Sequence, residues 1–297
     1  MRFNPFRKPE ETVTLNIECD SIRLLVVKGK EVQKWGNLEL EPGLVEEGLI
    51  VNPAAVGLGI KSLLTSQGAS GKGVVISLTG LRAIPRFLDL PDMPQHQLEE
   101  AIKREAKREM PLSLDDLYLS WQVTSKVGDK QHIYLLGVPR NMVDAHIRAL
   151  QAAGARPLAM DIKPLSLTRA VNKEKAIIAD LEADTLDVIV VVDCIPAIMR
   201  SFALRRELSP SEKVDRLADE LMRTVDFYNN SRTESPLGST TTVYVMGALM
   251  GERPLRNSLA KRIDRPIEVP EPPLEWPAHF PIAQYMVNIG LALKEVR

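Results

Sequence analysis

The sequence has 297 residues, of which 44% are hydrophobic and 26% charged, and this predicts a globular protein of two ordinary-sized lobes. Its 38 lysines and arginines nearly balance 39 aspartates and glutamates, giving a net charge of -1. This balance, with only 5% aromatic residues, argues against a broad basic or base-stacking surface, so no nucleic acid partner is expected.

Cysteine and histidine are too sparse for a metal centre or a nucleophilic catalytic set. Cys19 and Cys194 form no CxxC pair, so neither a disulfide framework nor a structural zinc site is expected, and a reducing cytoplasm fits. The four histidines are His96, His132, His146 and His279. They show neither the spacing of metal ligands nor a Ser/His/Asp or Cys/His catalytic pattern.

No apolar segment is long enough to span a bilayer. The longest, residues 188–192, stops at Asp193 and predicts a buried strand. Residues 1–11 are basic but have no apolar core, so they do not predict a signal peptide. Phe3 and Phe6 among basic residues could touch an anionic membrane weakly, although a disordered tail is the favoured interpretation.

The chain opens with a strand, a turn and a second strand. Residues 12–27 alternate and are rich in Val, Leu and Ile, and a polar turn at 18–20 interrupts them. The elements predicted next are a strand at 35–40, a helix at 51–64 and a buried strand at 74–78.

A mixed α+β unit is predicted to begin near residue 79. A helix that ends at Pro111 is indicated by apolar residues at helical spacing, namely Leu98, Ile102, Ala106 and Met110. Asn141 is expected to cap a second helix, which ends before Gly154. Strands are predicted at 86–90, 117–124, 132–138 and 157–162.

The final part of the chain repeats the opening pattern. Strands at 176–181 and 186–192 flank a polar turn at 182–184, and Ser209 with Glu212 forms a capping box before a long helix. The remaining elements are strands at 197–204 and 241–246, a helix at 253–262, a proline-rich loop at 266–277 and a helix at 282–296. This pattern alone predicts an α/β protein of two lobes.

The middle of the chain carries a more specific signal. In order and spacing it resembles the PilM family of type IV pilus assembly, through segments 90–94, 98–102, 110–112, 138–140, 152–154 and 161–167, and Gly290–Leu293 resembles the family's C-terminal helix. The resemblance implies an actin-like (ribonuclease H-like) two-lobed α/β fold with an inserted α+β subdomain. The first lobe is then 1–172, interrupted at about 79–162 by a partner-binding insert, and the second lobe is 173–297.

The family resemblance also implies a function. The chain is expected to be a cytoplasmic scaffold at the inner face of the cell membrane, serving a type IV pilus or a related competence or secretion system. It would bind the N-terminal cytoplasmic tail of a PilN-like membrane protein, associate with the membrane through that partner, and join the pilus assembly complex. The tail is expected in a groove between strands near 22–27 and the insert at 79–162.

Two alternatives come from related folds. One is an active actin-like ATP-binding protein or ATPase. The other is a membrane tether resembling FtsA, which would need a C-terminal anchor beyond a linker, whereas this sequence ends at Arg297 directly after its last predicted helix.

The nucleotide cleft implied by the resemblance departs from the family pattern. In such a cleft two glycine-containing turns bring backbone N–H groups to the phosphates, and an aspartate organises the metal ion. In the family, the first turn looks like Asp-Ile-Gly-Ser-Ser-Ser. At the matching positions this chain has Asn16, Ile17, Glu18, Cys19, Asp20 and Ser21. The family's second turn looks like Asp-Ile-Gly-Ala. At the matching positions this chain has Asp180, Leu181, Glu182 and Ala183, followed by Asp184. The adenosine-side glycines are reduced to Gly247 before Ala248.

These substitutions predict a degenerate cleft. Four acids, Glu18, Asp20, Glu182 and Asp184, would face a triphosphate, and each unit pair at ~4 Å costs about 1 kcal/mol even in water. No cofactor is therefore expected, and ATP with magnesium is the disfavoured alternative. Ordinary solvated hairpin tips are a second interpretation of the same turns.

Two charged helix faces also have two interpretations. Glu220 and Arg223 match family positions that border the nucleoside, or they form a solvated face. The basic run at 103–108 either contacts anionic lipid or an acidic partner, or is likewise solvated.

Overall fold

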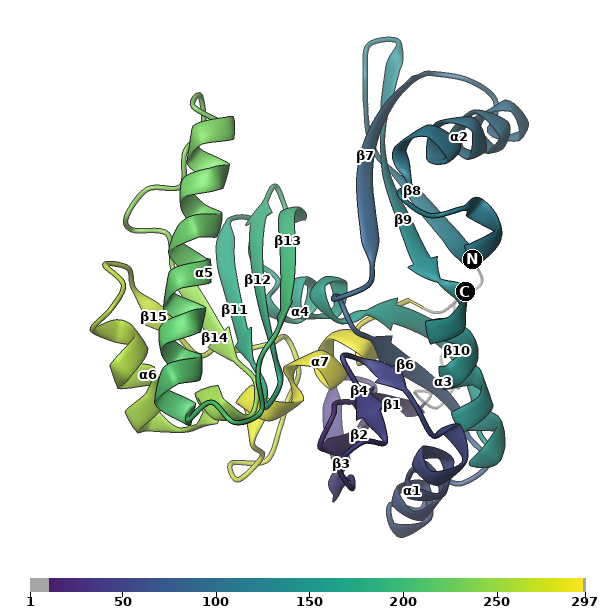
Figure 1. Ribbon diagram of the computed structural model, residues 1–297, viewed down its shortest axis with the longest axis vertical. Coiled ribbons are helices and arrows are strands. Elements are labelled where there is room, and N and C mark those ends of the chain that lie inside the picture. The colour runs from purple at the N-terminus through teal and green to yellow at the C-terminus, as the bar shows by residue number, and fades with distance from the viewer. Residues whose placement is uncertain (1–10, 296–297) are drawn as a thin grey trace. The chain divides into compact units, whose positions relative to one another are not determined.

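The computed structural model describes residues 11–295 and divides the chain into two compact units (Figure 1). One unit is Arg82–His146, and the other combines the described residues up to Leu81 with those from Ile147 onward. The basic, aromatic segment before residue 11 and the end of the last predicted helix lie outside the described residues.

The first sheet of the larger unit has the strand order β10-β6-β1-β2-β3. As predicted, β1 (Glu11–Ile17) and β2 (Ser21–Lys28) form a hairpin across the polar turn, and β3 (Glu31–Glu39) continues it. Both β6 (Gly73–Leu78) and β10 (Arg156–Ile162) are parallel neighbours on the other side. The helix α1 (Pro53–Ser66) begins where predicted, because the Asn52 side chain accepts a hydrogen bond from the Ala55 N–H.

The strand β2 itself cannot form the predicted groove wall near residues 22–27. In β2 every residue from Ile22 to Val27 is buried, because β1 and β3 pair with both of its edges. This strand therefore offers neither a free backbone edge nor an exposed side chain to a peptide. A short hairpin of β4 (Val45–Glu46) and β5 (Leu49–Ile50) was not predicted.

The second sheet repeats the first, in the order β13-β12-β11-β14-β15. It comprises β11 (Ala176–Leu181), β12 (Thr185–Val192), β13 (Ile195–Ala203), β14 (Val243–Met246) and β15 (Ile267–Glu268), the last lying inside the predicted proline-rich loop. The long helix α5 (Pro210–Ser231) starts at the predicted capping box, with Ser209 and Glu212 bonded reciprocally. A single 3-10 turn (Leu249–Gly251) precedes α6 (Arg253–Ala260).

Two helices lie between the sheets. They are α4 (Lys163–Val171), which was not predicted, and α7 (Ile282–Ala292), which contacts β1, β2, β6 and β14. The two helices cross so closely that a Cβ on Gly290 would collide with the Ser166 carbonyl oxygen, so this position requires glycine. One hydrophobic core runs through both sheets and both helices, and it includes Leu25, Leu167, Ile178 and Ile289.

The smaller unit is an antiparallel sheet of three strands with one helix on it. Its order is β7-β9-β8, from β7 (Ile84–Pro91), β8 (Leu117–Val127) and β9 (Lys130–Pro139). Apolar residues of α2 (Gln95–Glu109) pack on one face of the sheet, with Ile102 against Ile133 and Leu135 in one cluster. A 3-10 turn (Leu114–Asp116) leads into β8.

The boundaries of this unit differ from the predicted insert at 79–162. Residues 147–162 belong to the larger unit, since β10 pairs with β6 of its first sheet. The predicted cap at Asn141 is wrong, because α3 (Arg140–Ala152) already begins at Arg140 and so includes this residue. Gly154 follows the helix with a positive φ of 67°, as a C-terminal glycine should.

Candidate functional site

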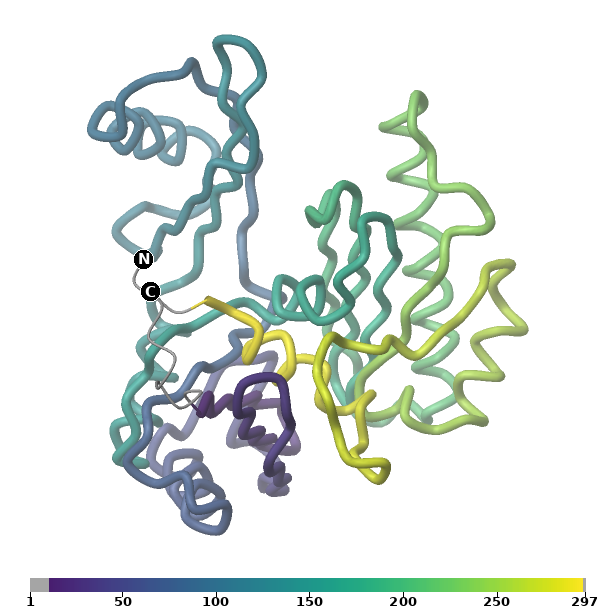
Figure 2. Tube along the Cα trace, turned by 180° about the vertical axis from the view of Figure 1, so that it is seen from behind, coloured from purple at the N-terminus to yellow at the C-terminus, as the bar shows by residue number. Residues whose placement is uncertain are grey.

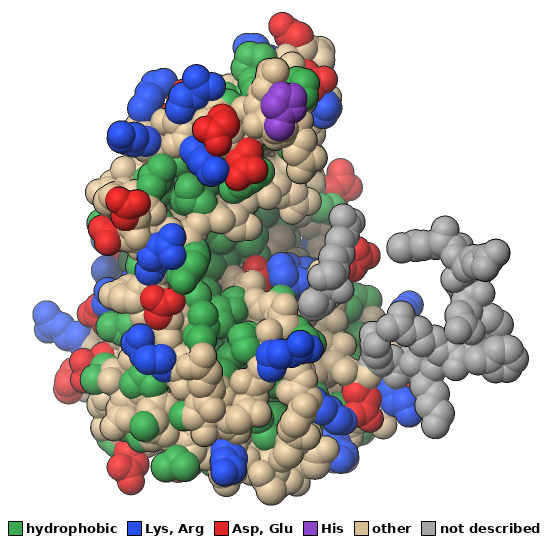
Figure 3. Space-filling model, turned by 90° about the vertical axis from the view of Figure 1, so that its right-hand side faces the viewer, with side chains coloured by type: hydrophobic (Ala, Val, Ile, Leu, Met, Phe, Trp, Pro, Cys, Tyr) green, Lys and Arg blue, Asp and Glu red, His purple; other side chains and the backbone are tan. Residues whose placement is uncertain are grey.

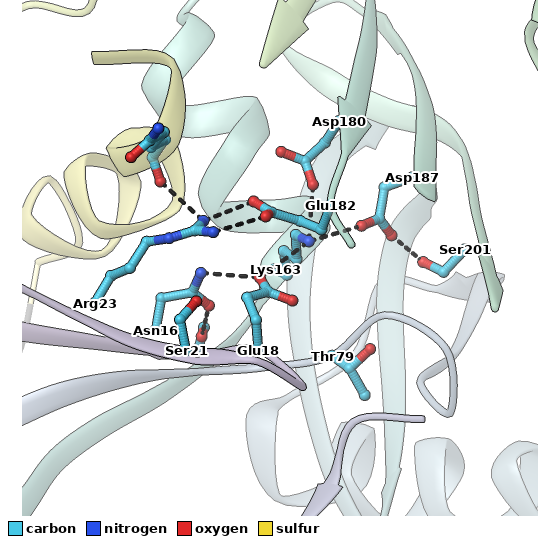
Figure 4. A network of polar contacts seen from close by, with 12 residues as sticks. Asn16, Glu18, Ser21, Arg23, Thr79, Lys163, Asp180, Glu182, Asp187 and Ser201 are labelled. Atoms are coloured by element: carbon cyan, nitrogen blue, oxygen red, sulfur yellow. Dashed lines mark hydrogen bonds and ion pairs between the residues drawn. The ribbon is translucent and has the colours of Figure 1, made fainter. Parts of the chain in front are cut away.

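Two equivalent turns of the repeated sheets meet in the larger unit. The β1–β2 turn is closed by a 2.9 Å hydrogen bond from the Glu18 N–H to the Ser21 carbonyl, and the β11–β12 turn by a 2.9 Å bond from the Glu182 N–H to the Thr185 carbonyl. The side chains of Glu18 and Glu182, one from each turn, lie in one buried polar network, drawn in Figure 4. The two turns that the sequence analysis assigned to one cleft do meet, but their side-chain contacts differ from those expected.

An arginine from the first sheet binds one of the acids in the second. Arg23 of β2 donates from Nη1 and Nη2 to the two carboxylate oxygens of Glu182, each over 2.7 Å, with 4% and 1% of the side chains exposed. Nη1 also donates to the Gln284 carbonyl of α7 at 3.1 Å. Burial acts to raise the pKa of Glu182, but Arg23, together with Lys163 and the Ala248 N–H, holds it below its ordinary value.

A lysine from α4 neutralises the other acids. The Lys163 Nζ lies 2.7 Å from Asp180 Oδ2, 3.1 Å from Glu18 Oε1 and 3.4 Å from Asp187 Oδ2. Burial acts to lower the pKa of Lys163, yet these carboxylates together raise it well above its ordinary value. The ammonium group is therefore charged, and it sits between residues of both sheets.

Acids still outnumber cations in the network. Within residues 11–295, the only cations that pair with Glu18, Asp180, Glu182 and Asp187 are Lys163 and Arg23. Because burial disfavours the excess negative charge, it raises the pKa of Glu18 to about 7 and that of Asp180 to about 6, against the lowering effect of Lys163. These two acids therefore take up protons more readily than ordinary carboxylates as the pH falls.

Asn16, where the resemblance led us to expect a metal-organising aspartate, has both ends of its amide hydrogen-bonded within the network. Its amide nitrogen donates to Glu18 Oε1 at 2.9 Å, and its oxygen accepts from the Ser77 hydroxyl. Each end of the amide thus already has a partner within the protein. Asp20 is exposed and accepts a 2.9 Å hydrogen bond from Ser21 Oγ, so it lies outside the network.

The remaining predicted cleft residues have structural roles. The buried Cys19 thiol bonds to Asp184, and burial together with this acid raises the pKa of the thiol. Gly247 has a φ of 97°, and a Cβ there would collide with the Leu181 carbonyl, so the backbone itself requires glycine. The Ala248 N–H hydrogen-bonds to the Glu182 side chain.

One cavity between the turns is small. A cavity of about 10 Å³ lies among residues that include Asn16, Glu18, Lys163 and Asp184. That volume holds roughly one water molecule, whereas sites for small organic ligands measure about 300–1,000 Å³. The interpretation of the turns as solvated tips holds for Asp20 but is wrong for Glu18 and Glu182, which are buried.

Sequence reasoning missed both cations of the network. Arg23 is the single charged residue in the apolar run from Ile22 to Val27, and a lone charge in a buried strand was an available signal for a buried partner. Lys163 starts the helix that was not predicted, immediately before Pro164. Without a helix between the sheets, nothing in the sequence placed its ammonium group among the acids.

The two charged helix faces pair locally. Glu220 on α5 is buried, and its carboxylate lies 2.9 Å from Arg216 and 3.1 Å from Arg223 of the same helix. On α2, Lys103 pairs with Glu99 at 2.9 Å and Arg108 with Glu105 at 3.1 Å. Basic and acidic side chains are likewise interspersed on the face drawn in Figure 3. On α2 these pairs favour the solvated interpretation, whereas the buried Glu220 on α5 is paired within its own helix.

Replacing Glu18 with glutamine is expected to change how stability depends on pH. The pKa of Glu18 is raised from 4.5 to about 7, so the wild type loses folding stability as the pH rises through this window. Glutamine has no proton to lose. The free energy of unfolding of Glu18→Gln, minus that of the wild type, should grow by about 1–3 kcal/mol across the window, as urea titrations at several pH values can measure.

The control for this variant is Glu212→Gln. The hydroxyl and N–H of Ser209 lower the pKa of Glu212, so this carboxylate stabilises the fold at high pH and the same difference should fall as the pH rises. A flat or falling difference for Glu18→Gln would contradict the assignment of its pKa.

The repeated sheets, their facing turns and the two helices between them define an actin-like protein that carries an inserted subdomain. Residues 15–209 match the family model described as type IV pilus assembly protein PilM. The chain belongs to the PilM family, as the sequence resemblance predicted.

Solved structures show the same fold. The protein of a PilM-PilN type IV pilus biogenesis complex is 20% identical with a TM-score of 0.78, over 97% of this chain and 99% of that one. The ethanolamine utilization protein EutJ from Carboxydothermus hydrogenoformans is 14% identical, with a TM-score of 0.56 over 98% of this chain and 91% of that one. The cytoplasmic domain of EpsL, an inner membrane component of the type II secretion system of Vibrio cholerae, is 16% identical, with a TM-score of 0.54 over 97% of each chain.

No curated protein matches the sequence. Within residues 11–295, none of the helices combines the length and the apolar character needed to cross a membrane.

Proposed function

We propose that this chain is a scaffold of type IV pilus assembly that binds the N-terminal cytoplasmic tail of a PilN-like inner-membrane protein. It then lies at the cytoplasmic face of the membrane through that partner and joins the assembly complex. The observation that carries the proposal is membership of the PilM family. Similarity over nearly the whole chain to the protein of a PilM-PilN complex supports the choice of partner.

The tail site is proposed on the smaller unit. Its strands β7 and β8 are the edges of the three-stranded sheet, and α2 covers one face. On the other face, Phe87 is 54% exposed and packs edge-on against Tyr134, with ring centres 5.3 Å apart. An extended peptide can add backbone hydrogen bonds to such an edge and place alternate apolar side chains against such rings.

Truncating Phe87 tests this site. The tail peptide of the PilN-like protein should bind the full chain with a dissociation constant of roughly micromolar order, as measured by fluorescence anisotropy. In Phe87→Ala the affinity should fall about tenfold or more, because an exposed aromatic anchor is lost.

The matched control is Phe227→Ala, which removes an equally exposed ring (54%) from α5 of the larger unit and should leave the affinity unchanged. Equal losses in both variants, or none in Phe87→Ala, would move the site elsewhere. A wild-type protein that does not bind the peptide would overturn the proposed function.

We also propose that the cleft does not bind nucleotide, so the chain works without ATP. The buried ion pairs and the small cavity support this, since a triphosphate would have to displace Arg23 from Glu182 and meet buried carboxylates. An actin-like ATPase is the rival function.

Magnesium-ATP is therefore expected to leave the melting temperature unchanged. A ligand at 100 times its dissociation constant adds about 2.7 kcal/mol, which corresponds to a shift of roughly 5 °C or more for a chain of this size. Differential scanning fluorimetry with ATP and magnesium at about millimolar concentration measures this. A magnesium-dependent rise that is lost in Asp180→Asn would favour the rival function.

A further inference from the structure

The ion pairs of the site connect the two sheets of the larger unit across a long stretch of sequence. Arg23 belongs to the first sheet and Glu182 to the second, 159 residues later. Lys163 likewise reaches Glu18 in the first sheet and Asp180 in the second. We propose that these contacts form a clasp that holds the two lobes of the larger unit in one closed arrangement without any ligand.

The geometry of the Arg23 contact makes the clasp directional. Both carboxylate oxygens of Glu182 are bound at 2.7 Å, and a third bond from the same guanidinium fixes it to Gln284 of α7. A bidentate pair tolerates little rotation. Turning one lobe against the other would break both bonds together and leave two buried charges unpaired, so partial opening is disfavoured as well as full separation.

A second connection joins the lobes at a different place. After β15, the segment from residue 269 to 281 crosses to β3 of the first sheet; we call it the strap. The Val32 N–H donates to the Glu275 carbonyl at 2.8 Å, and the Glu275 N–H donates to the Lys30 carbonyl at 2.7 Å. Trp35 packs against Phe280 of the strap, with ring centres 5.2 Å apart. In Figure 2 the strap lies beside the first strands of the chain.

Helix α7 adds a third tie to the first sheet. The fully buried Asn288 donates from Nδ2 to the Arg23 carbonyl at 3.0 Å and to the Thr14 carbonyl at 3.3 Å. The residue that holds Glu182 through its side chain is thus also held through its backbone. Movement of the lobes would have to disturb side chain, backbone and strap together.

The clasp rests on the proposal that the cleft does not bind nucleotide, because the charged side chains of the clasp fill the space between the two turns. It is independent of tail binding on the smaller unit. The test is the distance between a spin label on each lobe, at Lys61→Cys on α1 and Lys261→Cys after α6, with the exposed Cys194 replaced by serine. Pulsed electron–electron double resonance on the full chain gives the distribution of distances between the two spin labels.

A single narrow distribution is expected, unchanged by magnesium-ATP. Arg23→Ala should broaden the distribution. Arg23→Lys keeps the charge but cannot bind both oxygens of Glu182 at once, so it should broaden the distribution less. The control Arg262→Ala removes an exposed pair with Asp215 inside the second lobe and should match the wild type.

Four outcomes would overturn the inference, and two of them need only the wild type. A broad or two-peaked distribution without ligand overturns the clasp alone. A shift of the distance distribution on adding magnesium-ATP overturns both the clasp and the proposal that the cleft does not bind nucleotide. A folded Arg23→Ala that keeps the narrow peak shows that the strap holds the lobes without the clasp, and broadening in Arg262→Ala shows that the effect is not specific to it.

Discussion

Arg23→Met is expected to lower the free energy of unfolding by about 3–5 kcal/mol, because it leaves the Glu182 carboxylate buried without its cation. Methionine approximates the aliphatic stem of arginine, so most of the loss should come from the missing charge rather than from a cavity. Urea unfolding followed by circular dichroism near neutral pH gives the difference.

The double variant Arg23→Met/Glu182→Gln separates charge from packing. It removes both charges but keeps an oxygen to accept the Ala248 N–H, so it should recover a large part of the lost stability. The exposed pair of Arg262 and Asp215 is the comparison, and Arg262→Ala should cost less than about 1 kcal/mol. Additive losses in the double variant would show that the two residues act separately.

The second large effect is expected for Lys163→Met, and it should depend on pH. Without the ammonium group, Glu18 and Asp180 lose the charge that lowers their pKa values, which burial already raises to about 7 and about 6. Both acids then favour the protonated form in the folded state, so stability falls as the pH rises above the unfolded values.

The loss in Lys163→Met should reach about 3–5 kcal/mol in mildly alkaline solution and shrink toward mildly acidic pH. Urea titrations across that range measure it. The variant Lys213→Met replaces another buried lysine, one whose Nζ donates to the Ala183 carbonyl rather than to an acid, and serves as the control. A pH-independent loss in Lys163→Met would contradict the charge balance assigned to the network.

Local sequence signals predicted most of the secondary structure. The Val- and Ile-rich hairpins and the capping box at Ser209 depend on neighbouring residues, and both predictions are confirmed. The helix α4 was missed because its nine residues follow a strand directly, without a capping side chain that marks the start.

The content of the site could be predicted only in part. The matching of the two turns followed from the family resemblance, and both turns do meet. Which charges neutralise which acids depends on the packing of residues 159 positions apart, and no local pattern encodes that. The acids at Glu18 and Glu182 were therefore expected to repel a ligand, whereas the structure pairs them with Lys163 and Arg23.

The position of α7 has a consequence for biosynthesis. This helix ends at Ala292, yet it packs against the first strands of the chain and supplies Tyr285, Ile289 and Leu291 to the core that both sheets share. The parts of β1 and β2 that α7 covers therefore stay exposed until α7 has emerged from the ribosome. Contacts between such distant residues form slowly, and nascent chains of this kind expose hydrophobic surface meanwhile. The larger unit can therefore complete its core only after α7 has been synthesised, and a chain cut short before Ile282 is a substrate for chaperones and proteases.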